Sequence, residues 1–243
     1  MNIPSHQNVL LQRLSLCLAA IGFCLTVFGT PETVRAELSS EEDILIDKAR
    51  GTLESFLADP DMGWFRENIR DARGLLIVPQ FIKGAFFVGG SGGTGVLVVR
   101  DEKTNEWSYP AFFTLGGASF GLQFGGQASE VIVLILTQKG VDSMMSTTMK
   151  IGGDASVAVG PVGMGVEGST APNLSVDLVS FSRAKGLFAG VSLEGAVVAA
   201  RDAMNTSFYK APTKTVDIVV RRSVSNPKAD PLLDVVKKAT KAK

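Results

Sequence analysis

The chain has 243 residues, and its 24 basic and 24 acidic side chains leave a formal net charge of zero. This balance gives no indication of a nucleic-acid partner. Both cysteines, Cys17 and Cys24, and the single histidine, His6, precede residue 37. Residues 37–243 therefore have no thiol nucleophile, no imidazole base and no disulfide, and they lack the usual zinc ligands.

Residues 1–36 are expected to be a secretory signal peptide. An uninterrupted apolar or small-residue run, 14–28, follows Arg13, and Val34-Arg35-Ala36 is an acceptable cleavage pattern. The run is shorter than the roughly 20 residues of a membrane-spanning helix. We expect cleavage after Ala36 and a periplasmic or cell-envelope location; a retained anchor is the alternative.

Two helices are expected next. Residues 39–43 (SSEED) match a capping box, in which a hydroxyl caps the helix and a carboxylate three residues later returns the hydrogen bond. The helix that follows has an apolar stripe at helical spacing, and Asp59-Pro60 ends it. A second short helix is predicted over 62–71.

Glycine dominates the middle of the chain, because 21 of the 26 glycines lie between Gly84 and Gly195 and alternate with strand-forming residues. Glycine within strands is typical of bulges, sharp bends or close backbone approach. The pattern predicts a bent sheet with one face nearly free of side chains. Short strands are expected near 75–78, 120–124, 157–159, 174–178, 187–193 and 216–220, a buried strand at 131–136, and helices at 138–149 and 231–243.

These elements predict an α+β fold: a single domain with a bent antiparallel sheet, closed as a barrel or sandwich, and with N-terminal and inserted helices.

Three motifs resemble chemical sites but lack the sequence context that those sites need. Gly90–Gly95 matches a dinucleotide fingerprint, but a strand follows it instead of a helix. Ser119 lies in a G-x-S-x-G motif without a histidine base, and Ser182–Lys185 matches S-x-x-K without its companion motifs. No catalytic residue, metal site or cofactor is predicted.

Glu194 lies in an apolar, glycine-rich stretch predicted to be a strand. A buried carboxylate is costly unless it is paired. Glu194 is therefore expected either to form a structural salt bridge with a nearby basic residue or to be the polar floor of a ligand groove.

Several segments resemble the SYLF family, a lipid-binding module. The matching segments are ARGLLIVP (72–79), WSYPAF (107–112), residues 117–127 and, most specifically, SRAKGLFAGVSLEG (182–195). The resemblance implies a SYLF-like lipid-binding domain over 37–210, followed by a C-terminal strand and basic tail over 211–243. The resemblance implies that the chain has no enzymatic activity and that its partner is a membrane phospholipid. In the eukaryotic members this lipid is phosphoinositide, and for this chain we expect an anionic phospholipid. Some fungal members bind actin, a partner not expected for an exported bacterial protein.

The candidate lipid-binding residues lie within the matched motifs or close to them: Lys83, Arg183, Lys185, Arg201, Glu194 and Ser119. The four basic groups would attract anionic headgroups, and Trp64 and Trp107 are candidate interfacial anchors.

Two alternative functions remain open from the sequence. One is a small outer-membrane β-barrel, because alternating glycine-rich strands after a signal peptide also occur there. The other is a hydrolase that uses Ser119 or Ser182.

Overall fold

The computed structural model describes residues 39–85, 88–120, 125–161, 176–184 and 193–241. The expected signal peptide, the strand expected near 187–193 and the candidate residue Lys185 lie outside these ranges or almost wholly outside them. Residues from Ser39 onward form one compact unit.

Helix α2 (Glu41–Ala58) begins where the sequence predicts. The Ser40 hydroxyl accepts a hydrogen bond from the Asp43 backbone N–H at 3.2 Å, and the Asp43 carboxylate accepts one from the Ser40 N–H at 3.3 Å. This reciprocal pair satisfies two N–H groups that the first turn leaves unpaired. The predicted second helix is divided into η1 (Pro60–Met62), α3 (Gly63–Asn68) and η2 (Ile69–Asp71).

Eight strands of the described residues form one sheet in the order β5-β8-β3-β2-β1-β4-β7-β6. All neighbouring strands are antiparallel except β6 and β7. Ile151, directly after β5, forms a bridge with Ala155, two residues before β6, so the two edges of the sheet lie near each other and the sheet is curled. The bounds are β1 Gly74–Ala85, β2 Val88–Val99, β3 Ala111–Phe120, β4 Gly125–Ile135, β5 Thr148–Lys150, β6 Val157–Val159, β7 Leu178–Arg183 and β8 Val197–Ala200. The predicted α+β class with a bent sheet is confirmed.

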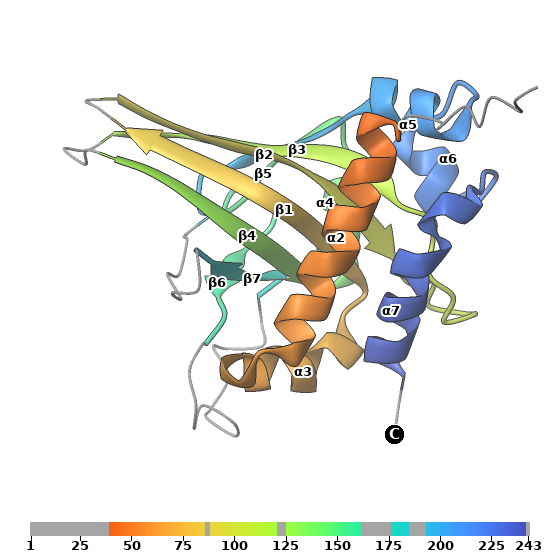
Figure 1. Ribbon diagram of the computed structural model, residues 1–243, viewed down its shortest axis with the longest axis horizontal. Helices are drawn as coiled ribbons and strands as arrows, with labels where there is room; N and C mark the ends of the chain where they lie inside the picture. The colour runs from red at the N-terminus through yellow and green to blue at the C-terminus, as the bar shows by residue number, and fades with distance from the viewer. Residues whose placement is uncertain (1–38, 86–87, 121–124, 162–175, 185–192, 242–243) are drawn as a thin grey trace, which may run out of the picture. The chain divides into compact units, whose positions relative to one another are not determined.

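The two faces of the sheet are covered differently (Figure 1). On the face that we call the helix face, α2 lies beside α7, and the Phe112 ring packs 5.3 Å from that of Phe208 in α5. On the inner face of the curl, Ile135 packs against Gly140 of α4. The remaining helices are α4 Gln138–Met144, α5 Asp202–Tyr209, α6 Thr215–Val219, η3 Pro227–Ala229 and α7 Asp230–Thr240.

Three expectations about the elements need correction. The strand expected at 216–220 is helix α6, because its buried residues, Thr215, Ile218 and Val219, recur at helical spacing. The helix expected over 138–149 ends at Met144, and β5 takes its last residues. The strand expected near 75–78 continues through Pro79 to Ala85, because the pairing register shifts there and a bulge tolerates a residue without an N–H.

Candidate functional site

A part of the sheet extends beyond the helices that cover it (Figure 1). In this part, Ile82 of β1 pairs with Gly92 and Ala128, and Gly84 pairs with Gly90. The register continues through Gly92 to Gly116 of β3 and from there to Val197 of β8. Directly opposed residues of an antiparallel pair point to the same face. We call the resulting surface the glycine face; it consists of Ile82, Gly84, Gly90, Gly92, Gly116, Ala128 and Val197.

The glycine face continues the helix face of the sheet. Ala128 has the same side-chain parity along β4 as Glu130, whose carboxylate accepts a hydrogen bond from Thr52 of α2 at 3.1 Å. Beyond that contact, none of the described helices covers the surface (Figure 1). Ile82 is 52% exposed and Val197 is 40% exposed. A Cβ added at Gly84 or Gly90 would meet no described atom within 4 Å. The predicted face with few side chains is therefore present, and it is apolar.

Glycines on the inner face have a different role. A Cβ at Gly95 would overlap the carbonyl oxygen of Ile77 and lie 2.7 Å from Val78 Cγ2. A Cβ at Gly93 would lie 2.8 Å from Val78 Cγ1. These two glycines allow the bulge of β1 to approach β2 closely. Packing thus explains Gly93 and Gly95, whereas Gly84 and Gly90 have room for a side chain.

Two exposed basic residues border the glycine face on its β8 side. Lys150 of β5 pairs directly with Val197. Arg201 follows β8, and its guanidinium donates to the Thr114 hydroxyl at 3.3 Å. Thr114 lies two residues before Gly116 in β3, so its side chain is on the same face. An apolar surface with a cationic border results.

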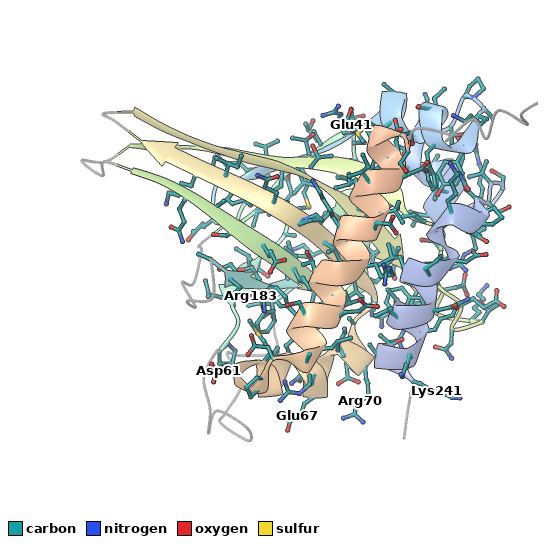
Figure 2. The ribbon with its side chains drawn as sticks, in the orientation of Figure 1. Glu41, Asp61, Glu67, Arg70, Arg183 and Lys241 are labelled. Atoms are coloured by element: carbon teal, nitrogen blue, oxygen red, sulfur yellow. The ribbon has the colours of Figure 1, made fainter. Side chains whose placement is uncertain are left out.

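Arg183, a predicted lipid-binding residue, is held inside an ionic cluster. Its Nε donates to Glu130 at 3.0 Å, its guanidinium lies 3.3 Å from the Asp59 carboxylate, and a further nitrogen donates to Ser55. The guanidinium also lies over the Phe56 ring, 5.4 Å from its centre. Figure 2 shows Arg183 beside the C-terminal half of α2. With two carboxylate partners and 18% side-chain exposure, Arg183 joins α2 to β4 and β7.

The other candidate residues do not gather around one point. Lys83 pairs with Ser91 and Gln127, which places it on the face opposite the glycine face. Glu194 is exposed in a turn before Gly195, whose φ is 81°, so the expected burial of Glu194 in a strand is wrong. The left-handed glycine lets the chain turn there instead of extending. Ser119 lies within β3, opposite Gly89, and not at a strand-to-helix elbow.

The two tryptophans are buried. Trp64 is 3% exposed and stacks 5.6 Å from the Phe181 ring, and Trp107 is 7% exposed. Neither of them can serve as an interfacial anchor in this arrangement. Within the ranges that the structure describes, no helix is long and apolar enough to cross a membrane, and no cluster of three potential metal ligands occurs.

Comparison with known proteins connects this architecture to a family. The family model Ysc84, described as "Las17-binding protein actin regulator", matches residues 116–239, from β3 to α7. The chain belongs to the Ysc84 family. This confirms the SYLF resemblance. The matched region includes the Gly116, Val197, Lys150 and Arg201 part of the site, whereas β1 and β2 precede it.

Individual relatives extend the similarity. The human SH3 domain-containing YSC84-like protein 1 is 31% identical over 169 residues, which are 69% of this chain and 49% of the relative. Protein YSC84 of Saccharomyces cerevisiae is 33% identical over 171 residues, 69% of this chain and 36% of the relative. LAS seventeen-binding protein 3 of the same yeast is 32% identical over 171 residues, 69% of this chain and 37% of the relative. The chain thus spans less than half of the length of each of these three relatives.

Asp177 is the most heavily hydrogen-bonded carboxylate among the described residues of this Ysc84-family chain. It is 5% exposed and accepts from the Thr137 hydroxyl at 2.6 Å, from the Ser156 N–H and hydroxyl at 2.9 Å each, and from Lys139 at 3.2 Å. Burial opposes its ionisation, but these hydrogen bonds outweigh burial and hold the pKa of Asp177 well below its usual range. Its lone pairs are occupied, so Asp177 fastens α4 and the β6 region to β7.

Proposed function

We propose that this chain is a non-enzymatic phospholipid-binding protein of the cell envelope and that its glycine face rests on the membrane. The supporting observation is the glycine face itself: an open, uncharged and apolar sheet surface beyond the helices. Exposed apolar patches of this kind on soluble domains are typical of interaction sites. The resemblance to a lipid-binding family, already noted, indicates phospholipid as the ligand.

A glycine-rich sheet face is physically suited to acyl chains. Along the glycine face, strands β1 and β2 have paired neighbours on both sides, β4 and β2 for β1, and β1 and β3 for β2, so their backbone N–H and C=O groups are largely paired within the plane of the sheet. An acyl chain lying on the face would therefore meet few unsatisfied polar groups, which are the costly element in a hydrocarbon environment. Burying the exposed half of Ile82 contributes about 1 kcal/mol, and Val197 adds to this.

The cationic border would supply the preference for anionic lipid. On the β8 side, Lys150 pairs with Val197. Arg201 lies on the same side and donates a hydrogen bond to Thr114. Each basic residue near an anionic membrane contributes about 1 kcal/mol, and this contribution decreases with salt. Lys83 lies on the opposite face and Arg183 is paired, so neither of them is required for this mode of binding.

Catalysis by the two candidate serines has no support in the geometry. Ser119 is part of a continuous strand, and Ser182 is 3% exposed within β7. A nucleophile elbow needs an exposed serine on a sharp turn.

Co-sedimentation of the full chain with vesicles tests the proposal. Binding should increase with the fraction of anionic lipid and decrease with salt. Val197→Ser should weaken it, whereas the matched change Val220→Ser, at a 60% exposed residue just beyond α6, should not. A chain that ignores vesicles of every composition, or equal binding by Val197→Ser and wild type, contradicts the proposal.

A second arm addresses the description of the family model, which refers to Las17 binding and actin regulation. Co-sedimentation with actin filaments in the absence of lipid should leave the chain in the supernatant. If the chain pellets with filaments and not with vesicles, a filament-binding function replaces the phospholipid one.

A further inference from the structure

A cavity of about 540 Å³ lies where the loop between β2 and β3 meets the end of α7. Its lining residues are Arg100, Asn105, Trp107, Lys237, Thr240 and Lys241. Three of the six are cations, and none is a carboxylate. The volume is within the usual range for small-molecule sites, about 300–1,000 Å³. The indole and the methylene chains of the basic residues give the walls an apolar part.

The cations of this cavity have no acidic partner in the part of the chain that the structure describes. Arg100 lies over the Trp107 ring, 5.8 Å from its centre, and makes no ion pair there. Lys237 and Lys241 are exposed and likewise form none. Elsewhere, Arg73, Arg183 and Arg222 do have carboxylates within 4.0 Å. The unpaired cations are thus available to a ligand.

The walls of the cavity are fixed before any ligand arrives. Trp107 donates its indole N–H to the Thr240 hydroxyl at 3.1 Å, and Thr240 in turn donates to the Val236 carbonyl at 2.8 Å. In the loop, the Asp101 carboxylate accepts from the backbone N–H groups at 103 and 104, and Asn105 has a left-handed φ of 58°. A rigid site loses less entropy when it binds a ligand.

Nearby carboxylates do not cancel the positive charge. A neighbouring hollow shares Arg100 and Asn105 with the cavity, and its other lining residues are Asp71, Arg73, Asp101 and Glu102. Glu102 is paired with Arg73, and Asp101 lies 4.0 Å from Arg222 besides accepting its two loop hydrogen bonds. Asp71 remains exposed and is not part of the cationic cavity.

From these contacts we infer that the cavity is a binding site for a phosphoryl-bearing anion with a small apolar or ring-shaped carbon part. Arg100, Lys237 and Lys241 provide the countercharge, and Asn105 provides an amide donor. Arginine and lysine are the usual partners of phosphoryl oxygens, and the arginine fork allows two parallel hydrogen bonds. The carbon part would lie against the methylene chains and the edge of Trp107.

This site is separate from the glycine face. Arg100 lies eight residues beyond Gly92 along the chain, directly after β2, which is a length of about 26 Å at the rise of an extended strand. Figure 2 likewise shows Lys241 at the end of the molecule opposite the uncovered ends of β1–β4. A chain that rests on a flat membrane by its glycine face therefore holds this cavity away from that surface. Anion binding in the cavity can therefore be tested separately from lipid binding by the glycine face.

Trp107 provides a direct assay. The chain has two tryptophans, so a ¹H–¹⁵N spectrum of the full chain contains two indole N–H peaks, assigned from a Trp64→Phe sample. Titration with phenyl phosphate at low ionic strength should shift the Trp107 peak and leave the Trp64 peak in place. Lys237→Gln should weaken the affinity about two- to fivefold, as expected for one exposed charge pair. Lys238→Gln is the matched control, since Lys238 is also exposed but does not line the cavity.

Inorganic phosphate and anionic vesicles are the other two arms. A Trp107 shift with phenyl phosphate, together with vesicle binding that Lys237→Gln does not change, identifies a soluble ligand. If Lys237→Gln weakens vesicle binding and phenyl phosphate competes with the vesicles, the ligand is a lipid headgroup. Each of these results supports the site. No Trp107 shift with either phosphate compound, or equal weakening by Lys237→Gln and Lys238→Gln, overturns it, whatever the glycine-face variants do.

Discussion

Replacing Arg183 with methionine should reduce stability and leave lipid binding unchanged. The substitution keeps an unbranched chain over the Phe56 ring but removes the guanidinium that lies between Glu130 and Asp59. Two carboxylates with 31% and 15% side-chain exposure then lose their common cation. The remaining negative charges repel each other and are incompletely solvated.

The size of the effect follows from the contacts. Removing one partner of a fully buried ion pair costs about 3–5 kcal/mol, and exposed pairs cost less than about 1 kcal/mol. The partial exposure of this cluster places the expected loss between these limits, at about 2–3 kcal/mol. In a domain of about 200 residues this corresponds to a decrease in Tm of roughly 4–12 °C.

Urea and thermal unfolding followed by circular dichroism measure the change. Arg50→Met is the control, because Arg50 is an arginine of α2 whose ion pair with Glu54, at 3.1 Å, is exposed. This substitution should change stability by less than about 0.5 kcal/mol. A double-mutant cycle with Glu130→Gln should show clear coupling to Arg183. The account of Arg183 is refuted if Arg183→Met is as stable as Arg50→Met, or if it weakens vesicle binding without altering stability.

Three further substitutions test the fold. Gly95→Ala should destabilise the chain by about 3 kcal/mol or more, because its Cβ overlaps the β1 bulge. Gly84→Ala, whose Cβ meets no described atom, should change stability by less than about 0.5 kcal/mol. Equal effects of the two substitutions in denaturant titrations would contradict the distinction between the two kinds of glycine. The lowered pKa of Asp177 means that its contribution is fully present above its unfolded value of 3.8 and is lost as the pH falls further. Asp177→Asn should therefore cost roughly 2 kcal/mol at neutral pH and should show a smaller acid-dependent loss than wild type; parallel pH profiles would contradict this.

The sequence predicts the local features of this fold well. The capping box at Ser40 and Asp43 and the amphipathic helix near the C-terminus depend on spacing within one element, which a single sequence contains. Residues 216–220 are misassigned because Val216, Ile218 and Val220 alternate like a strand, while tertiary packing selects the helical period. The position of β5 is also missed, since three residues give too short a pattern.

The candidate site was predictable only in part. The glycine pattern indicates a face with few side chains, but which glycines share that face depends on the register among β1, β2, β3 and β4. Lys150 was missed because its proximity to Val197 arises from pairing between β5 and β8, which are distant in sequence. Arg183 was selected for its charge, and only the three-dimensional structure reveals Glu130 and Asp59 as its partners.

Contact between the glycine face and lipid is the central claim, and a polarity-sensitive fluorophore at residue 84 tests it most directly. Gly84→Cys is introduced into a chain in which Cys17 and Cys24 are replaced by serine, and Val220→Cys serves as the control position. On addition of anionic vesicles, the emission of the label at residue 84 should shift to the blue, and that of the label at residue 220 should not. Vesicle binding without a blue shift at residue 84, or with equal shifts at both positions, would contradict the claim.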